Sequence, residues 1–74
     1  MTREELVALR QRAGNLRSQD LVDAAERCGY SHARTKGGHH AYSKPGVRTL
    51  IIPDKLTSGT ARGIINRLIG ELES

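Results

Sequence analysis

The chain of 74 residues has a single cysteine, Cys28, and no tryptophan or phenylalanine. One cysteine excludes an internal disulfide and cannot by itself build a cysteine-based zinc site, which is typical of a protein from a reducing compartment. The aromatic residues are Tyr30 and Tyr42, so aliphatic side chains must supply most of a core. This length predicts one small domain over residues 1–74, with a single thin core.

Long apolar runs are also missing. No stretch is long enough to span a membrane, and the N-terminus lacks the hydrophobic segment of a signal peptide. We therefore expect a cytoplasmic protein with no membrane partner.

Acidic residues are scarce in the middle of the chain. Residues 30–67 contain seven basic side chains and a single acidic one, Asp54, whereas residues 1–29 contain five of each sign. A segment with a net charge of +6 favours a polyanion as the partner, and nucleic acid is the common one. The alternative is a solvated basic surface that only aids solubility.

Two helices are predicted before this basic segment. Thr2 and Glu5 have the spacing of a capping box, and the helix that they start should end near Gly14. Ser18 is the expected N-cap of a second helix. Its apolar residues recur at helical spacing, and Gly29 fits the position just after its end.

Strands and turns should follow. Residues 31–36, 39–43 and 47–52 are predicted strands, and the turns between them contain Gly37-Gly38 and Pro45-Gly46. Turns this short join strands in an antiparallel meander.

A last helix should begin at Thr57 or Ser58, and its apolar stripe needs a sheet face to cover it. Leu50 and Ile52 are the expected partners of that stripe. The sequence therefore predicts an α+β fold in the order α-α-β-β-β-α, with a three-stranded antiparallel sheet packed on helices by one face.

The segment Lys36-Gly37-Gly38-His39-His40 is the candidate working site. Histidine exchanges protons near neutral pH, and glycine lets the backbone approach a phosphate closely. Alternation along a strand sends His39 and His40 to opposite faces of the sheet. His40 is then either a structural residue packed beside Tyr42 or an auxiliary catalytic group. The glycine pair is either a phosphate cradle or an ordinary turn between strands.

An ordered set of motifs resembles the HicA toxin family. The set is Cys28-Gly29-Tyr30, Lys36-Gly37-Gly38-His39-His40-Ala41-Tyr42, Pro45-Gly46, Thr49-Leu50-Ile51-Ile52-Pro53 and Gly59-Thr60. The resemblance implies a fold similar to a double-stranded-RNA-binding domain, α-β-β-β-α, over a core of residues 18–72. Residues 1–15 then form an extra N-terminal helix. It also implies an mRNA-cleaving toxin that a HicB antitoxin holds inactive.

The resemblance makes His39 the functional histidine. Cleavage needs a base that removes the proton of an RNA 2′-hydroxyl, so that this oxygen attacks the neighbouring phosphate, and ideally an acid for the leaving 5′ oxygen. His39 is our choice for the proton-transfer residue, as general acid or base. Arg34 and Lys36 could bind the phosphate, with the backbone N–H groups of Gly37 and Gly38 as further donors. The predicted RNA-binding residues are Arg34, Lys36, Gly37, Gly38, Arg48, Lys55 and Arg62. His32 is expected to be a surface residue.

The first hypothesis is therefore the toxin of a type II toxin–antitoxin pair, a ribosome-independent mRNA endoribonuclease. Its partners would be mRNA and a HicB-type antitoxin that covers His39 and the basic face, with no direct contact to DNA. Neither a cofactor nor a metal is expected, because adjacent histidines on a strand point apart and no further ligand lies at a suitable spacing. The alternatives are a non-catalytic RNA-binding domain and a protein-interaction domain whose charge steers a protein partner.

Overall fold

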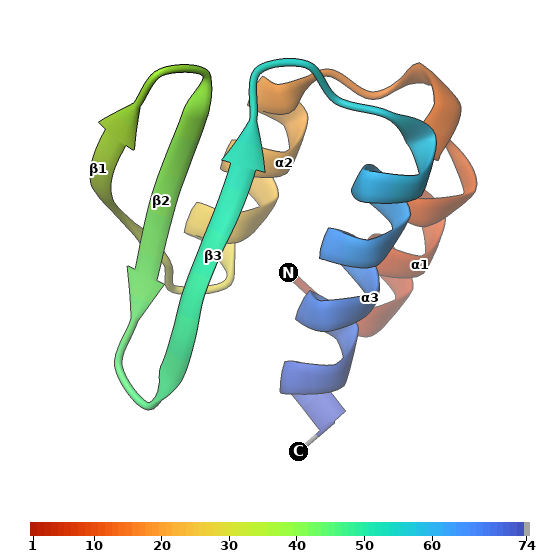
Figure 1. The fold of residues 1–74 in the computed structure, drawn as a ribbon. Coiled ribbons are helices and arrows are strands. Elements are labelled where there is room, and N and C mark those ends of the chain that lie inside the picture. The colour runs from red at the N-terminus through yellow and green to blue at the C-terminus, as the bar shows by residue number, and fades with distance from the viewer. Residues whose placement is uncertain (74) are drawn as a thin grey trace.

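The computed structural model describes residues 1–73. Three α-helices, one short 3-10 helix and three strands follow one another along the chain (Figure 1). They are α1 (Arg3–Gln11), η1 (Ala13–Asn15), α2 (Ser18–Arg27), β1 (Ser31–Lys36), β2 (His39–Lys44), β3 (Val47–Pro53) and α3 (Ser58–Glu73). The α+β fold and the predicted order of elements are confirmed.

The first helix starts as its sequence predicts. The Thr2 hydroxyl accepts a hydrogen bond of 3.2 Å from the Glu5 backbone N–H, and the Glu5 carboxylate accepts one of 2.9 Å from the Thr2 N–H. α3 is capped by Thr57, whose hydroxyl accepts from the Thr60 N–H at 3.2 Å. Gly29 follows α2 with a φ of 98°, a left-handed conformation that glycine adopts without strain.

The start of α2 differs from the prediction. Ser18 is the first helical residue and Arg17 is the N-cap, with its backbone N–H donating to the Asp20 carboxylate at 2.8 Å. The Ser18 hydroxyl donates instead to the backbone carbonyls of Pro53 and Asp54. These carbonyls lie where the chain leaves β3, so Ser18 joins α2 to the end of the sheet.

The sheet is an antiparallel meander in the order β1-β2-β3. Residues that pair across neighbouring strands share a face, so the register assigns the two faces. The side toward the helices carries His32, Thr35, His40, Tyr42, Leu50 and Ile52, and the open side carries Arg34, Lys36, His39, Ala41, Ile51 and Pro53. The predicted separation of His39 from His40 is confirmed.

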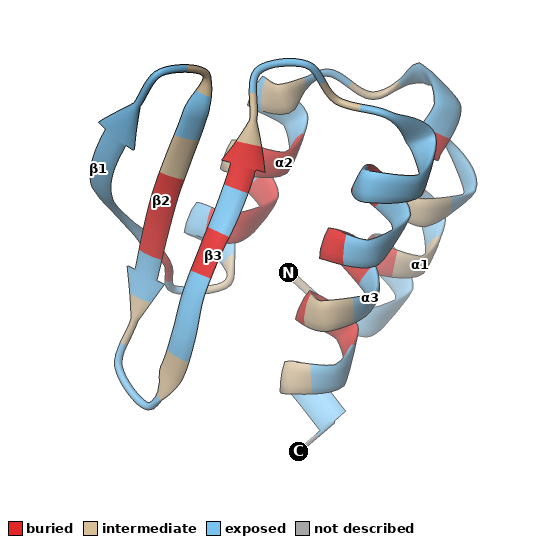
Figure 2. Cartoon of the chain, in the orientation of Figure 1, coloured by how far each residue is buried: buried red, intermediate tan, exposed pale blue. Residues whose placement is uncertain are grey.

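The core lies between the sheet and the helices (Figure 2). Leu50 and Ile52 are buried with the α3 stripe, as predicted. The N-terminal helix is part of this core, because Leu6 is fully buried, Leu9 is 8 % exposed, and α1 packs along α3. Within the described residues, no helix has both the length and the apolar character needed to cross a membrane.

A polar cluster ties β3 and the chain after α2 to α3. The Arg67 guanidinium donates to the carbonyls of Thr49 and Arg48 and to the Glu71 carboxylate, and the Tyr30 hydroxyl donates to Glu71 at 2.6 Å. Burial and the hydrogen bond to Glu71 raise the pKa of Tyr30. Burial also acts to raise the pKa of Glu71. The hydrogen bonds from Tyr30 and Arg67 outweigh it, so that the Glu71 pKa is lowered.

We expect Glu71→Gln to destabilise the fold in a pH-dependent way. Its cost at pH 7 should be about 1–2 kcal/mol, because hydrogen bonds to a charged group are worth slightly more than neutral ones. A carboxyl with a lowered folded pKa stabilises the fold above its unfolded pKa, near 4.5, and loses this contribution as the pH falls through the folded value. Urea unfolding at pH 7 and pH 3 should show a smaller difference from wild type at pH 3.

The matched control for this measurement is Glu4→Gln, at an exposed position on α1. It removes the same charge and should cost less than Glu71→Gln at pH 7, about 0.3–1 kcal/mol, through its lost interaction with the helix dipole. An equal cost of Glu71→Gln at both pH values would contradict the assignment.

Candidate functional site

His39 is the first residue of β2 and follows the turn that joins β2 to β1. It pairs with Lys36 on β1 and with Pro53 on β3, so all three strands meet beside it. Its side chain is exposed on the open face of the sheet, which leaves the imidazole accessible to a substrate.

A hollow of about 270 Å³ lies next to His39. Its lining residues are Gly38, His39, Pro53, Asp54 and Lys55. The hollow therefore combines a proton-exchanging ring, a carboxylate and an ammonium group at the end of the sheet where β3 runs out toward α3 (Figure 1).

The glycine pair forms the two-residue turn between β1 and β2. Gly37 has a φ of 59°, whereas Gly38 does not have a positive φ. Positive φ at the first turn position alone is the pattern of a type II′ hairpin turn. Gly37 is therefore needed for the turn itself. The glycine pair thus serves as an ordinary turn between strands. Its use as a phosphate cradle stays a prediction.

Asp54 was not among the predicted site residues. Its backbone N–H donates to the Gly38 carbonyl at 2.7 Å, which extends the strand pairing by one residue beyond β3. Its carboxylate Oδ1 contacts His40 Nε2, and the His40 Nδ1 lies 2.9 Å from the Thr35 hydroxyl. The signal in the sequence was a lone acidic residue directly after a strand, within an otherwise basic segment.

His40 and its neighbours form a chain of hydrogen bonds on the helix side of the sheet. The Thr35 hydroxyl also lies 2.8 Å from His32 Nε2, and the His32 ring packs edge-on against Tyr42 with centroids 5.4 Å apart. The His40 side chain is 27 % exposed. Both of its ring nitrogens therefore have protein partners, while Asp54 connects it to the hollow beside His39.

The structure brings only some of the predicted RNA-binding residues near His39. Arg34 and Lys36 share its open face, and Lys55 lines the same hollow. Arg48 lies by the β2–β3 hairpin, at the far end of the sheet. The six residues of β2 put that end about 17 Å from His39 at 3.3 Å per residue. Arg62 is exposed on α3, outside the sheet.

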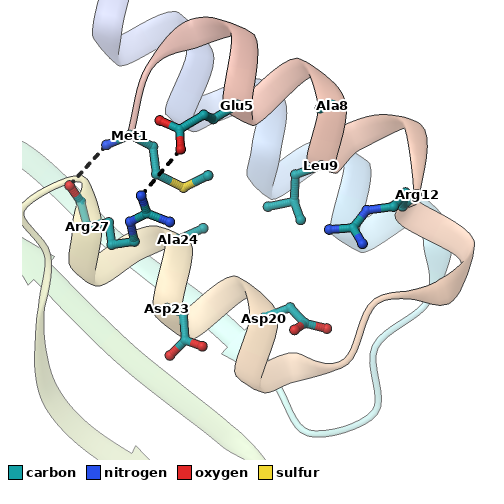
Figure 3. Close-up of a pocket in the computed structure, with 9 residues that line it drawn as sticks. All are labelled: Met1, Glu5, Ala8, Leu9, Arg12, Asp20, Asp23, Ala24 and Arg27. Atoms are coloured by element: carbon teal, nitrogen blue, oxygen red, sulfur yellow. Dashed lines mark hydrogen bonds and ion pairs between the residues drawn. The ribbon is translucent and has the colours of Figure 1, made fainter.

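A second hollow of about 330 Å³ lies between α1 and α2 (Figure 3). Glu5 and Arg27 form an ion pair at one end, and the Met1 amino group donates to the Arg27 carbonyl. None of the predicted site residues line it. Among residues 1–73, no group of three or more His, Cys, Asp or Glu side chains could hold a metal ion.

One of three comparisons with known proteins found a match. No curated protein and no solved structure matches the chain significantly. A family model described as the HicA toxin of bacterial toxin–antitoxin systems matches residues 18–69, from the first residue of α2 to the buried Ile69 of α3. Because this match covers more than half of the 74 residues, the chain belongs to the HicA toxin family.

Proposed function

We propose that this toxin is a ribosome-independent mRNA endoribonuclease that uses His39 for proton transfer. The observation that supports it most is the position of His39. The ring is exposed beside a hollow, with Lys55 on the hollow's wall and Lys36 directly across the strand pair. A base or acid next to two cations is what phosphodiester cleavage requires.

RNA supplies its own nucleophile in this reaction. Removal of the 2′-hydroxyl proton lets O2′ attack the adjacent phosphorus, the P–O5′ bond breaks, and the 5′ oxygen takes up a proton. The products carry a 2′,3′-cyclic phosphate and a 5′-hydroxyl. Lys36, Lys55 and Arg34 would stabilise the extra negative charge on the phosphorus oxygens, so the reaction needs no metal.

The open face also fits a protein partner of the proposed HicB type. Ile51 lies halfway along the edge strand β3 and is 44 % exposed, and the cations of β1 lie on the same face across β2. An antitoxin with an apolar centre and an acidic rim would cover Ile51 and the basic side chains together. Binding there would also cover His39, which shares the face.

A substrate analogue tests the proposed chemistry. The purified chain, in buffer with a chelator, should cleave a labelled RNA and should bind but not cleave the same sequence with 2′-O-methyl groups. Methylation blocks the attacking oxygen without removing the phosphates that dominate binding. Cleavage of the methylated strand would overturn the mechanism. Salt-sensitive binding with no cleavage of unmodified RNA would favour the non-catalytic RNA-binding alternative.

A further inference from the structure

Proton transfer at both ends of the reaction needs two groups. One must take the proton from the 2′-hydroxyl, and the other must give a proton to the leaving 5′ oxygen. When both transfers take place in one concerted step, His39 can serve only one of the two oxygens. The hollow beside it holds two further titratable side chains, Asp54 and Lys55.

We infer that Asp54 is the second proton-transfer residue of this pocket, acting as the base while His39 acts as the acid. This inference rests on the proposed ribonuclease function. The Asp54 carboxylate takes the 2′-hydroxyl proton as O2′ bonds to phosphorus. The P–O5′ bond then breaks, and the 5′ oxygen takes the proton of the His39 imidazolium. Each residue afterwards exchanges one proton with water.

The two carboxylate oxygens of Asp54 have different surroundings. Oδ1 contacts His40 Nε2 on the helix side of the sheet. Oδ2 is the oxygen nearest to Gly38, where an added Cβ would lie 3.5 Å from it. The side chain as a whole is 59 % exposed. His40 therefore holds one oxygen, while the other faces the turn that precedes His39.

The backbone of Asp54 is held from two directions. Its N–H donates to the Gly38 carbonyl at 2.7 Å, and its own carbonyl accepts from the Ser18 hydroxyl at 3.0 Å. These bonds join the end of β3 to the turn before β2 and to the start of α2. A carboxylate placed by a strand, a turn and a helix is preorganised, which is what proton transfer within a pocket requires.

His40 is a weaker candidate for the second group. Both of its ring nitrogens are within hydrogen-bond distance of protein atoms, and it does not line the hollow. We therefore assign His40 as a positioning residue that orients the Asp54 carboxylate.

Asp54→Asn tests the assignment, because it keeps the shape of the side chain and removes its basicity. The kcat for RNA cleavage should fall by about 10²–10⁴-fold, with little change in KM. The decisive substrate has sulfur in place of the bridging 5′ oxygen. A thiolate leaves without protonation, so this substrate should restore cleavage by His39→Ala but not by Asp54→Asn.

Asp23→Asn is the matched control, since it makes the same change on α2, outside the site. It should cleave like wild type, and thermal unfolding should show that all variants are folded. If Asp54→Asn does not fold, Asp54→Ser replaces it in the same assay. A kcat equal to that of Asp23→Asn, or rescue of the Asp54 variant by the sulfur substrate, would overturn the assignment but leave the ribonuclease function standing. Failure of wild type to cleave any RNA would overturn both.

Discussion

Replacing His39 by alanine is expected to remove nearly all RNA cleavage, and we expect wild type, but not this variant, to arrest the growth of a bacterial host. Loss of a positioned acid or base lowers the rate by about 10²–10⁴-fold. The fold should be unaffected, because the His39 side chain is exposed and has no hydrogen bond or ion pair among residues 1–73. RNA binding should also persist, since the cations around the site remain.

Two measurements and a control variant separate a loss of catalysis from a loss of folding. Thermal unfolding should match wild type, and the affinity for 2′-O-methyl RNA should stay within a few-fold, because phosphate contacts supply most of the binding. Gln11→Ala, at an exposed position on α1, is the surface control and should keep both cleavage and toxicity. Full cleavage by His39→Ala would show that another residue transfers the proton. If wild type and His39→Ala were equally harmless to the host, this would argue against a nuclease.

Replacing Leu6 by alanine is expected to cause the largest loss of stability among the variants considered. Leu6 is fully buried between α1 and the rest of the core. Truncating a buried leucine costs about 2–5 kcal/mol through lost transfer free energy and the cavity left behind. The total free energy of unfolding of a domain of this size is only about 4–11 kcal/mol. The variant should therefore lose much of its cooperative unfolding transition.

Glu4→Ala is the matched control, because it lies on the same helix with an exposed side chain. It should shift the free energy of unfolding by no more than about 1 kcal/mol, the interaction of a first-turn carboxylate with the helix dipole. Urea unfolding followed by circular dichroism measures both. If Leu6→Ala unfolded like wild type, α1 would be an appendage and not part of the core, despite its packing on α3.

The helix boundaries show how far local patterns can be trusted. Thr2 with Glu5 predicted the first cap, because a cap is satisfied within four residues of sequence. For the last helix the same rule left Thr57 and Ser58 open, and the structure selects Thr57. Ser18 was predicted as a cap and is not one, since carbonyls 35 and 36 residues away compete for its hydroxyl. A cap predicted from the local sequence fails where a distant acceptor takes the hydrogen bond of the capping side chain.

The candidate site also contains features that follow from local sequence patterns and features that depend on distant residues. Strand alternation predicted that His39 and His40 would face opposite sides of the sheet, and the register confirms it. The register also places Lys36 on the same face as His39. Asp54 escaped the prediction because its relation to Gly38 and His40 depends on how β3 pairs with β2. Arg48 was grouped with the site by charge, but the length of β2 separates it from His39.

By itself, the order of residues determined the element types, the tight turns, the basic middle segment and the motifs shared with HicA toxins. These properties depend on neighbours within a few positions, or on composition. The packing of α1 on α3, the link from Ser18 to the end of β3 and the contact of Asp54 with His40 were decided only by the tertiary structure. Each depends on groups that are far apart in the chain and meet only when the sheet closes over the helices.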